Sequence, residues 1–296
     1  MALRRRPVVV GVDGSATARH AVRWAAARAR RDGLPLRLVH AYQLPLGAPT
    51  GVTQEESVLD TLRRNGRRWL GQARDVAAVV VPGLSVETEL VAMPATTGLM
   101  RESEEASVLV LGNQGRSALA DLLMGSTALA LSGHAHCPVV LVRDGAAGPP
   151  GTGPVVVGVD GTDASEAAVA FAFAEAAAEG VPLVALNAYT ESMLETALVG
   201  DNTPLDRTLQ HELADRVLAE RLVGWQEKYP QVRIEREAVP DRPTRALRRC
   251  AETARLVVLG RRGPCGLRDL VLGSNSGHLL HHAACPVAVV RSEPPE

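Results

Sequence analysis

The chain has 296 residues, which is enough for two domains of ordinary size. It is 46% hydrophobic but only 3% aromatic, so its cores would be packed mainly with small aliphatic side chains. The formal net charge of −1 argues against a bulk attraction to nucleic acid or membrane surfaces, and no apolar run approaches the length of a membrane span. We expect a cytoplasmic protein whose four cysteines stay reduced.

The first half of the chain predicts strands that alternate with helices. The apolar run from Val8 to Asp13 predicts a buried strand, and helical periodicity follows it at 16–31. Alternating strands and helices indicate right-handed βαβ units and a parallel sheet. The remaining strands are predicted at 36–41, 85–90, 107–111 and 138–142, and the remaining helices within 53–80 and at 94–105 and 126–133.

The second half repeats the first. Pro7 to Ser15 returns as Pro154 to Thr162 at an offset of 147, with eight of the nine positions identical. A segment rich in glycine, proline and alanine separates the copies and is a linker by composition. We therefore predict one domain at 1–144, a linker at 145–153 and a second domain at 154–296. The strands of the second copy are predicted at 155–160, 183–188, 232–237, 256–259 and 287–290.

The polarity of the strands predicts their order. The strands at 8–13 and 107–111 are almost wholly apolar and should be central, whereas Glu87 and Glu89 mark the third strand as an edge. Order 3-2-1-4-5 fits, so the fold class is α/β, with two tandem Rossmann-like domains that each hold a doubly wound, five-stranded parallel sheet. Ligands of such sheets bind where the strand order reverses, which is beside Asp13 and Gly112 at the ends of strands one and four.

A glycine-rich motif follows the fourth strand of each copy. Gly112 and Gly115 would let the loop turn sharply and approach a ligand closely. Nine residues later, Gly125 precedes a predicted helix, with Ser126 or Thr127 as its N-cap. The free backbone amides at the start of this helix, its dipole and the hydroxyls of Ser126 and Thr127 together favour the binding of phosphate. A structural glycine turn is the alternative, but a second copy with the same spacing favours a nucleotide loop. That copy consists of Gly260, Gly263, Gly273, Ser274, Asn275 and Ser276.

The chain resembles the universal stress protein family in its tandem, ATP-binding form. The matching residues are 10–15, the glycine motif and 136–140, and the resemblance covers both halves. It implies an adenine nucleotide, ATP, at each switch point. In the first copy the implied contacts are Gly11, Asp13, Ala41, Gly112, Asn113, Gln114, Gly115, Arg116, Gly125, Ser126 and Thr127. In the second copy they are Gly158, Asp160, Ala188, Gly260, Arg261, Arg262, Gly263, Gly273, Ser274, Asn275 and Ser276.

The second copy departs from the first at two positions of the motif. Asn275 stands where the first copy has Thr127, and Pro264 stands where it has Arg116. The phosphate contacts of the second copy therefore differ, with Arg261 and Arg262 as the candidate cations.

Catalysis is not expected from these residues. The chain lacks the lysine of a G-x-x-x-x-G-K-[ST] loop, and no poised base is evident. Asp13 is either a water-mediated Mg2+ ligand or a structural turn residue. Two function classes remain: a regulatory, stress-response nucleotide-binding module, or a slow ATPase or nucleotidyl-transferring enzyme. We expect the first.

Histidines and cysteines near the fifth strands invite a metal interpretation. Their spacing differs between the copies, as H-x-H-C and H-x-x-H-H, and no carboxylate lies nearby in sequence. The histidines are better explained as residues that cap a helix end or stay solvated, and the cysteines as buried residues, so we expect no metal site.

The fifth strand of each copy is apolar, although it is nominally an edge. Val139 to Val142 and Val287 to Val290 would be exposed to aggregation if left uncovered. We expect the two strands to pair within the chain, and a homodimer of the whole chain is the less favoured alternative.

Overall fold

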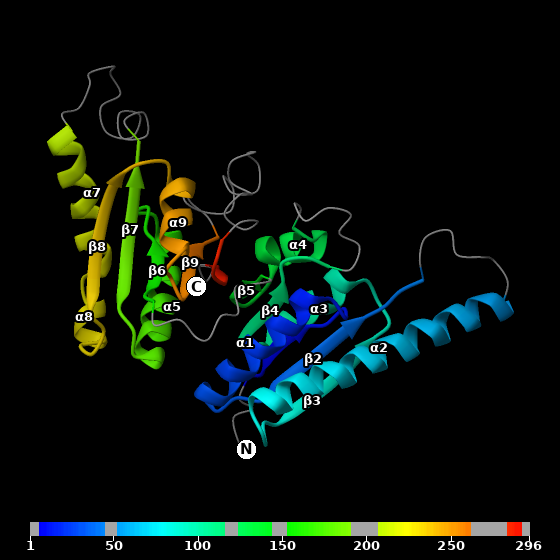
Figure 1. Ribbon diagram of the computed structural model, residues 1–296. Coiled ribbons are helices and arrows are strands. Elements are labelled where there is room, and N and C mark those ends of the chain that lie inside the picture. Colours follow the sequence, from blue (N-terminus) through cyan, green and yellow to red (C-terminus); the bar gives the residue numbers. More distant parts are fainter. Residues whose placement is uncertain are drawn as a thin grey trace. The chain divides into compact units, whose positions relative to one another are not determined.

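The structure is a computed structural model, and it describes residues 6–44, 52–115, 124–143, 153–190, 207–261 and 283–291 (Figure 1). The chain separates into two compact units, residues 1–147 and 148–296. Among the described residues, no helix combines the length and apolar character that crossing a membrane requires.

The first unit is a parallel sheet with helices on both faces. Its strand order is β3-β2-β1-β4-β5, as predicted. Helices α1 and α2 pack against each other and against the sheet, whereas α3 packs with α4. The elements are β1 Val8–Gly11, α1 Ala16–Asp32, β2 Leu36–Ala41, α2 Val52–Val80, β3 Val86–Val91, α3 Ala95–Glu105, β4 Val108–Gly112, α4 Ser126–His134 and β5 Val139–Val142.

The second unit has the same topology. Its order β8-β7-β6-β9-β10 is again 3-2-1-4-5 when its strands are counted along the chain. The elements are β6 Val155–Gly158, α5 Asp163–Glu179, β7 Leu183–Tyr189, α7 Arg207–Leu222, α8 Trp225–Lys228, β8 Ile234–Pro240, α9 Pro243–Ala251, β9 Leu256–Gly260 and β10 Val287–Val290. The linker prediction falls almost wholly on residues outside the described ranges.

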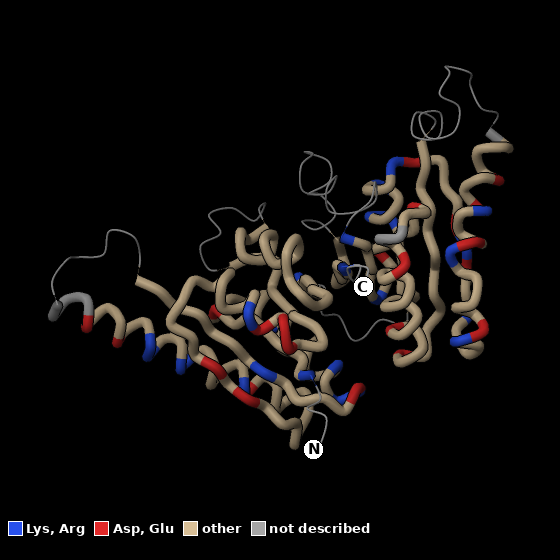
Figure 2. Tube along the Cα trace, turned by 180° about the vertical axis from the view of Figure 1, so that it is seen from behind, with Lys and Arg blue, Asp and Glu red and all other residues tan. Residues whose placement is uncertain are grey.

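Buried aliphatic side chains hold each sheet to its helices. β1 and β4 carry no charge and are almost entirely buried, and the inward side of α1 is largely alanine, which lets that helix lie close to the strands. Charged residues lie on the helices and outer strands (Figure 2). In β3, Glu87 pairs with Arg37 of β2 at 3.0 Å, as expected of an outer strand.

Several predicted strand boundaries were wrong, among them that of β6, which ends at Gly158 rather than Asp160. The first strand ends at Gly11 rather than Asp13, because the Asp13 carboxylate takes part in the following turn. The third strand of the second unit begins at Ile234 rather than Val232, because the Val232 amide closes a turn onto the Tyr229 carbonyl. That strand then continues to Pro240, opposite Tyr189.

Candidate functional site

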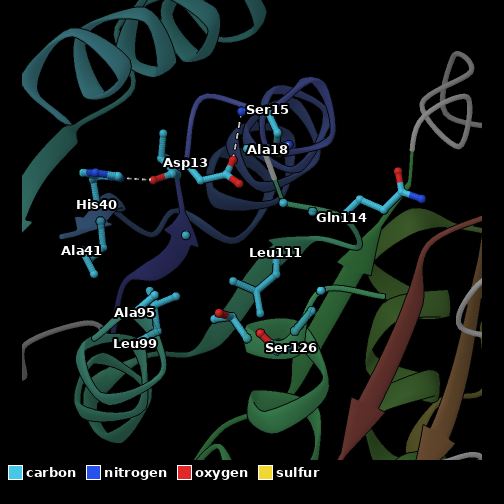
Figure 3. Close-up of a pocket in the computed structure, with 18 of the residues that line it drawn as sticks. Asp13, Ser15, Ala18, His40, Ala41, Ala95, Leu99, Leu111, Gln114 and Ser126 are labelled. Carbon is cyan, nitrogen blue, oxygen red and sulfur yellow. Dashed lines mark hydrogen bonds between the residues drawn. The ribbon is translucent and has the colours of Figure 1, made fainter. Parts of the chain in front are cut away.

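A cavity of about 610 Å3 lies in the first unit, where β1 and β4 end (Figure 3). This is the predicted switch point, since β1 and β4 are neighbours whose crossover connections run in opposite directions. The lining residues are Gly11, Val12, Asp13, Ser15, Ala18, Val39, His40, Ala41, Ala95, Leu99, Leu111, Gly112, Gln114, Gly115, Met124, Gly125, Ser126, Thr127 and Ala128. Apart from Asn113, every described residue of the first copy that was predicted to contact the nucleotide lines this cavity.

Asp13 organises the turn between β1 and α1. Its Oδ1 accepts the Ser15 amide at 2.9 Å (Figure 3), and the Ser15 hydroxyl caps α1 by accepting the Ala18 amide at 3.1 Å. The second unit repeats the turn, since Asp160 Oδ1 accepts the Thr162 amide at 3.0 Å. Asp13 therefore has the structural role that its sequence position allowed. A Cβ added at Gly115 would lie 3.3 Å from Asp13 Oδ2. This oxygen therefore lies beside the glycine loop, residues Gly112 to Gly115.

The glycine loop is held against the start of α1. The Thr17 hydroxyl donates to the Gln114 carbonyl at 2.6 Å, across 97 residues of sequence. A Cβ at Gly112 would lie 2.8 Å from the Thr17 carbonyl carbon and 2.9 Å from the Ala18 nitrogen. Glycine at position 112 is thus required by the close approach of α1, which the sequence did not reveal, and the approach of a ligand to Gly112 stays a prediction. At Gly115 an added Cβ would meet only Asp13 Oδ2 within 4 Å, and the close approach of a ligand to this glycine stays a prediction.

Helix α4 presents free amides to the cavity. It begins at Ser126 with Gly125 as its N-cap, so the prediction of Ser126 or Thr127 as the cap was wrong by a residue. Gly125 is placed by its own amide, which donates to the Asn113 carbonyl at 2.9 Å. Ser126 and Thr127 stand in the first helical turn, where backbone N–H groups have no intrahelical acceptor. These amides are suited to binding an anion.

Asn113 lies behind the cavity rather than on its surface. Its side chain is 1% exposed, and neither amide atom has a hydrogen-bond partner among the described residues. Its backbone links β5 to α4, since its N–H donates to the Val142 carbonyl at 3.0 Å and its carbonyl accepts from Gly125. Asn113 therefore contributes to the site by positioning Gly125.

An apolar wall and a histidine complete the cavity, and motif analysis missed most of them. Leu99 and Leu111 meet over Gly11, where an added Cβ would lie 3.0 and 2.7 Å from their methyl carbons. His40 donates from Nδ1 to the Val12 carbonyl at 2.6 Å, because a carbonyl can only accept, and its ring meets Trp69 edge-on at 5.0 Å. The available sequence signal for His40 was a polar residue directly before Ala41 at the end of a mostly apolar strand.

The described contacts of the second unit occupy matching places. Gly158 and Gly260 end the neighbouring strands β6 and β9, and Asp160 makes the turn that follows β6. Ala188 is buried in β7, and the Arg261 amide donates to the Val290 carbonyl at 2.8 Å. Seven further predicted contacts lie outside the described residues: Arg116, Arg262, Gly263, Gly273, Ser274, Asn275 and Ser276.

The described cysteines and histidines form no metal site. No group of three or more histidine, cysteine or acidic side chains with a geometry for a metal ion occurs within the described ranges. Burial raises the pKa of the Cys137 and Cys285 thiols to about 12, so both stay protonated at neutral pH. These two cysteines therefore pack as small apolar side chains.

Comparison with known proteins identifies the family. Residues 4–143 and 152–291 each match the universal stress protein family. The chain belongs to the universal stress protein family. Universal stress protein Rv2623 of Mycobacterium tuberculosis is 38% identical over 289 residues, covering 96% of either chain.

A solved universal stress protein shares the fold. It comes from Archaeoglobus fulgidus and aligns with 98% of this chain and 99% of its own, with a TM-score of 0.72 and 16% sequence identity. Another from the same organism, solved in complex with dAMP, aligns with 47% of this chain and 99% of its own at 23% identity, with a TM-score of 0.36.

Proposed function

We propose that this universal stress protein binds ATP and acts as a nucleotide-responsive regulatory module in the cytoplasm. The observation that carries the proposal is that one cavity joins the Asp13 turn, the glycine loop and the first turn of α4. Its volume of about 610 Å3 falls within the usual range of small-molecule sites, about 300 to 1,000 Å3.

The two ends of the cavity suit the two ends of a nucleotide. The amides of Gly115, Ser126 and Thr127 and the α4 dipole favour phosphate oxygens. Leu99 and Leu111 offer an apolar surface to a base. The second unit would hold a nucleotide at the matching places, and Mg2+ would accompany the phosphates through water bound to Asp13.

We further propose that nucleotide is bound without rapid turnover. Among the described residues that line the cavity, Asp13 is the one carboxylate, and its Oδ1 already accepts the Ser15 amide. His40 Nδ1 is likewise engaged by the Val12 carbonyl. Both side chains are thus held in structural hydrogen bonds within the fold, and this favours binding over rapid turnover. Slow hydrolysis or nucleotidyl transfer is the alternative that the experiment must test.

Native mass spectrometry and calorimetry of the full chain test this proposal. We expect saturable ATP binding, ATP rather than ADP or AMP in the protein as purified, and turnover far below the ordinary enzymatic range of about 1 to 1,000 per second. Absence of ATP binding would refute the binding function. Turnover within that range, removed by one substitution in the cavity, would instead establish an enzyme.

We also propose that the fifth strands of the two units pair. The Leu109 amide of β4 donates to the Pro138 carbonyl, and the Asn113 amide directly after β4 donates to the Val142 carbonyl. Alternation therefore turns the Val139 and Leu141 amides away from β4. If the β5 strand is paired on that side, these two amides should exchange with deuterium as slowly as amides of β4. Exchange at the rate of an unstructured peptide would contradict the pairing.

A further inference from the structure

A chain of hydrogen bonds crosses the first unit beneath the cavity. The Ser15 amide donates to Asp13, the Ser15 and Thr17 hydroxyls lie 3.1 Å apart, and the Thr17 hydroxyl donates to the Gln114 carbonyl at 2.6 Å. A hydroxyl has one proton, so Thr17, which gives its proton to Gln114, must accept from Ser15. Ser15 therefore donates to Asp13 through its amide and to Thr17 through its hydroxyl, and the bonds together join the end of β1 to the loop after β4.

This chain sets the direction of one peptide group in the glycine loop. In a trans peptide the C=O and the following N–H point in opposite directions. Because Thr17 holds the Gln114 carbonyl towards α1, the Gly115 N–H points away from α1. No described residue accepts a hydrogen bond from this N–H. A Cβ added at Gly125 would lie 3.6 Å from the Gly115 nitrogen, so this nitrogen lies on the side of Gly125. The Gly115 amide is thus aimed towards the helix start that favours an anion.

The second unit lacks the residue that makes this connection. Helices α1 and α5 both have 17 residues and align at an offset of 147, which places Ala164 at the position of Thr17. The Thr162 hydroxyl, equivalent to that of Ser15, donates back to Asp160 Oδ1 at 2.6 Å. The Ser165 hydroxyl also turns back, donating to the Thr162 carbonyl at 2.7 Å. These bonds stay within the turn between β6 and α5.

We propose that Thr17 is a positioning residue that aims the Gly115 amide at the nucleotide phosphates, and that the first unit is therefore the tighter of two unequal sites. This rests on the proposed nucleotide binding. Thr17 is 4% exposed and does not line the cavity, so it acts through the loop rather than by touching the ligand. A loop held in its binding conformation loses less entropy when the ligand binds.

Photolabelling of the full chain with 8-azido-ATP, followed by peptide mapping, reads the two units separately. In the wild type, peptides of residues 1–147 should reach half-maximal labelling at a lower concentration than peptides of residues 148–296. Thr17→Val keeps the shape of the side chain and removes the hydroxyl. It should raise the half-maximal concentration of the first unit roughly 3- to 10-fold, the usual worth of one hydrogen bond, and leave the second unit unchanged.

Matched variants separate positioning from folding. Thr17→Ser restores the hydroxyl and should restore wild-type labelling, whereas Thr61→Val removes an exposed α2 hydroxyl bonded to the Ser57 carbonyl and should change nothing. If Thr17→Val does not fold, Thr17→Ala is compared with Thr17→Ser instead. Equal labelling of both units, or an unchanged first unit without the hydroxyl, would overturn the inference. Labelling that ATP cannot compete away in either unit would instead refute the proposed function.

Discussion

Replacing Gly112 with alanine is expected to destabilise the first unit by about 1 to 3 kcal/mol, the usual cost of forcing a methyl group into a packed site. The new Cβ would lie 2.8 and 2.9 Å from backbone atoms of Thr17 and Ala18, which cannot rotate away as a side-chain end can. Relief requires that α1 move from β4 and carry Thr17 away from Gln114. Nucleotide binding to the first unit should therefore weaken as well.

Gly71→Ala is the matched control for this substitution. Gly71 lies within α2, and its Cβ would have no atom within 4 Å. The same chemical change should there stabilise the protein by about 0.5 to 1 kcal/mol, because alanine loses less backbone entropy than glycine in a helix. Urea unfolding measures both variants. An unfolding free energy of Gly112→Ala at or above the wild-type value would show that α1 does not constrain this position.

The fold was largely predictable because its signals are local. Most of the β-strands are short apolar runs, each copy carries its strands in the same order, and Glu87 and Glu89 were enough to assign the third strand to an edge. The boundaries that were wrong depend on side-chain or turn hydrogen bonds, such as that of Asp13 with Ser15, which no periodicity reports.

The candidate site was predictable only where a motif marks it. Glycines and hydroxyls located the loop and the start of α4. Thr17 and Leu99 carry no such mark, because their contribution comes from contacts between distant segments of the chain. The contact of Gly112 with α1 was missed for the same reason: a sequence shows that a position lacks a side chain but not which neighbour occupies the space.

Ser126→Glu should abolish most nucleotide binding in the first unit without destabilising it. Ser126 is exposed, lines the cavity and is the first residue of α4. A carboxylate at a helix N-terminus interacts favourably with the dipole, which should raise the unfolding free energy by about 0.3 to 1 kcal/mol. The same charge would face the phosphates, and repulsion over several ångströms at an effective dielectric constant near 20 predicts roughly 10- to 100-fold weaker binding.

The opposite signs of these two effects make the result specific to the site. A variant that merely unfolds loses both stability and binding, whereas this one should lose binding alone, as urea unfolding and 8-azido-ATP labelling of residues 1–147 would measure. Ser126→Gln has the same length without the charge and should bind within about threefold of wild type, since the amides of α4 remain. If Ser126→Glu binds ATP as tightly as Ser126→Gln does, the phosphates do not lie at the start of α4, and the cavity holds its ligand in another orientation.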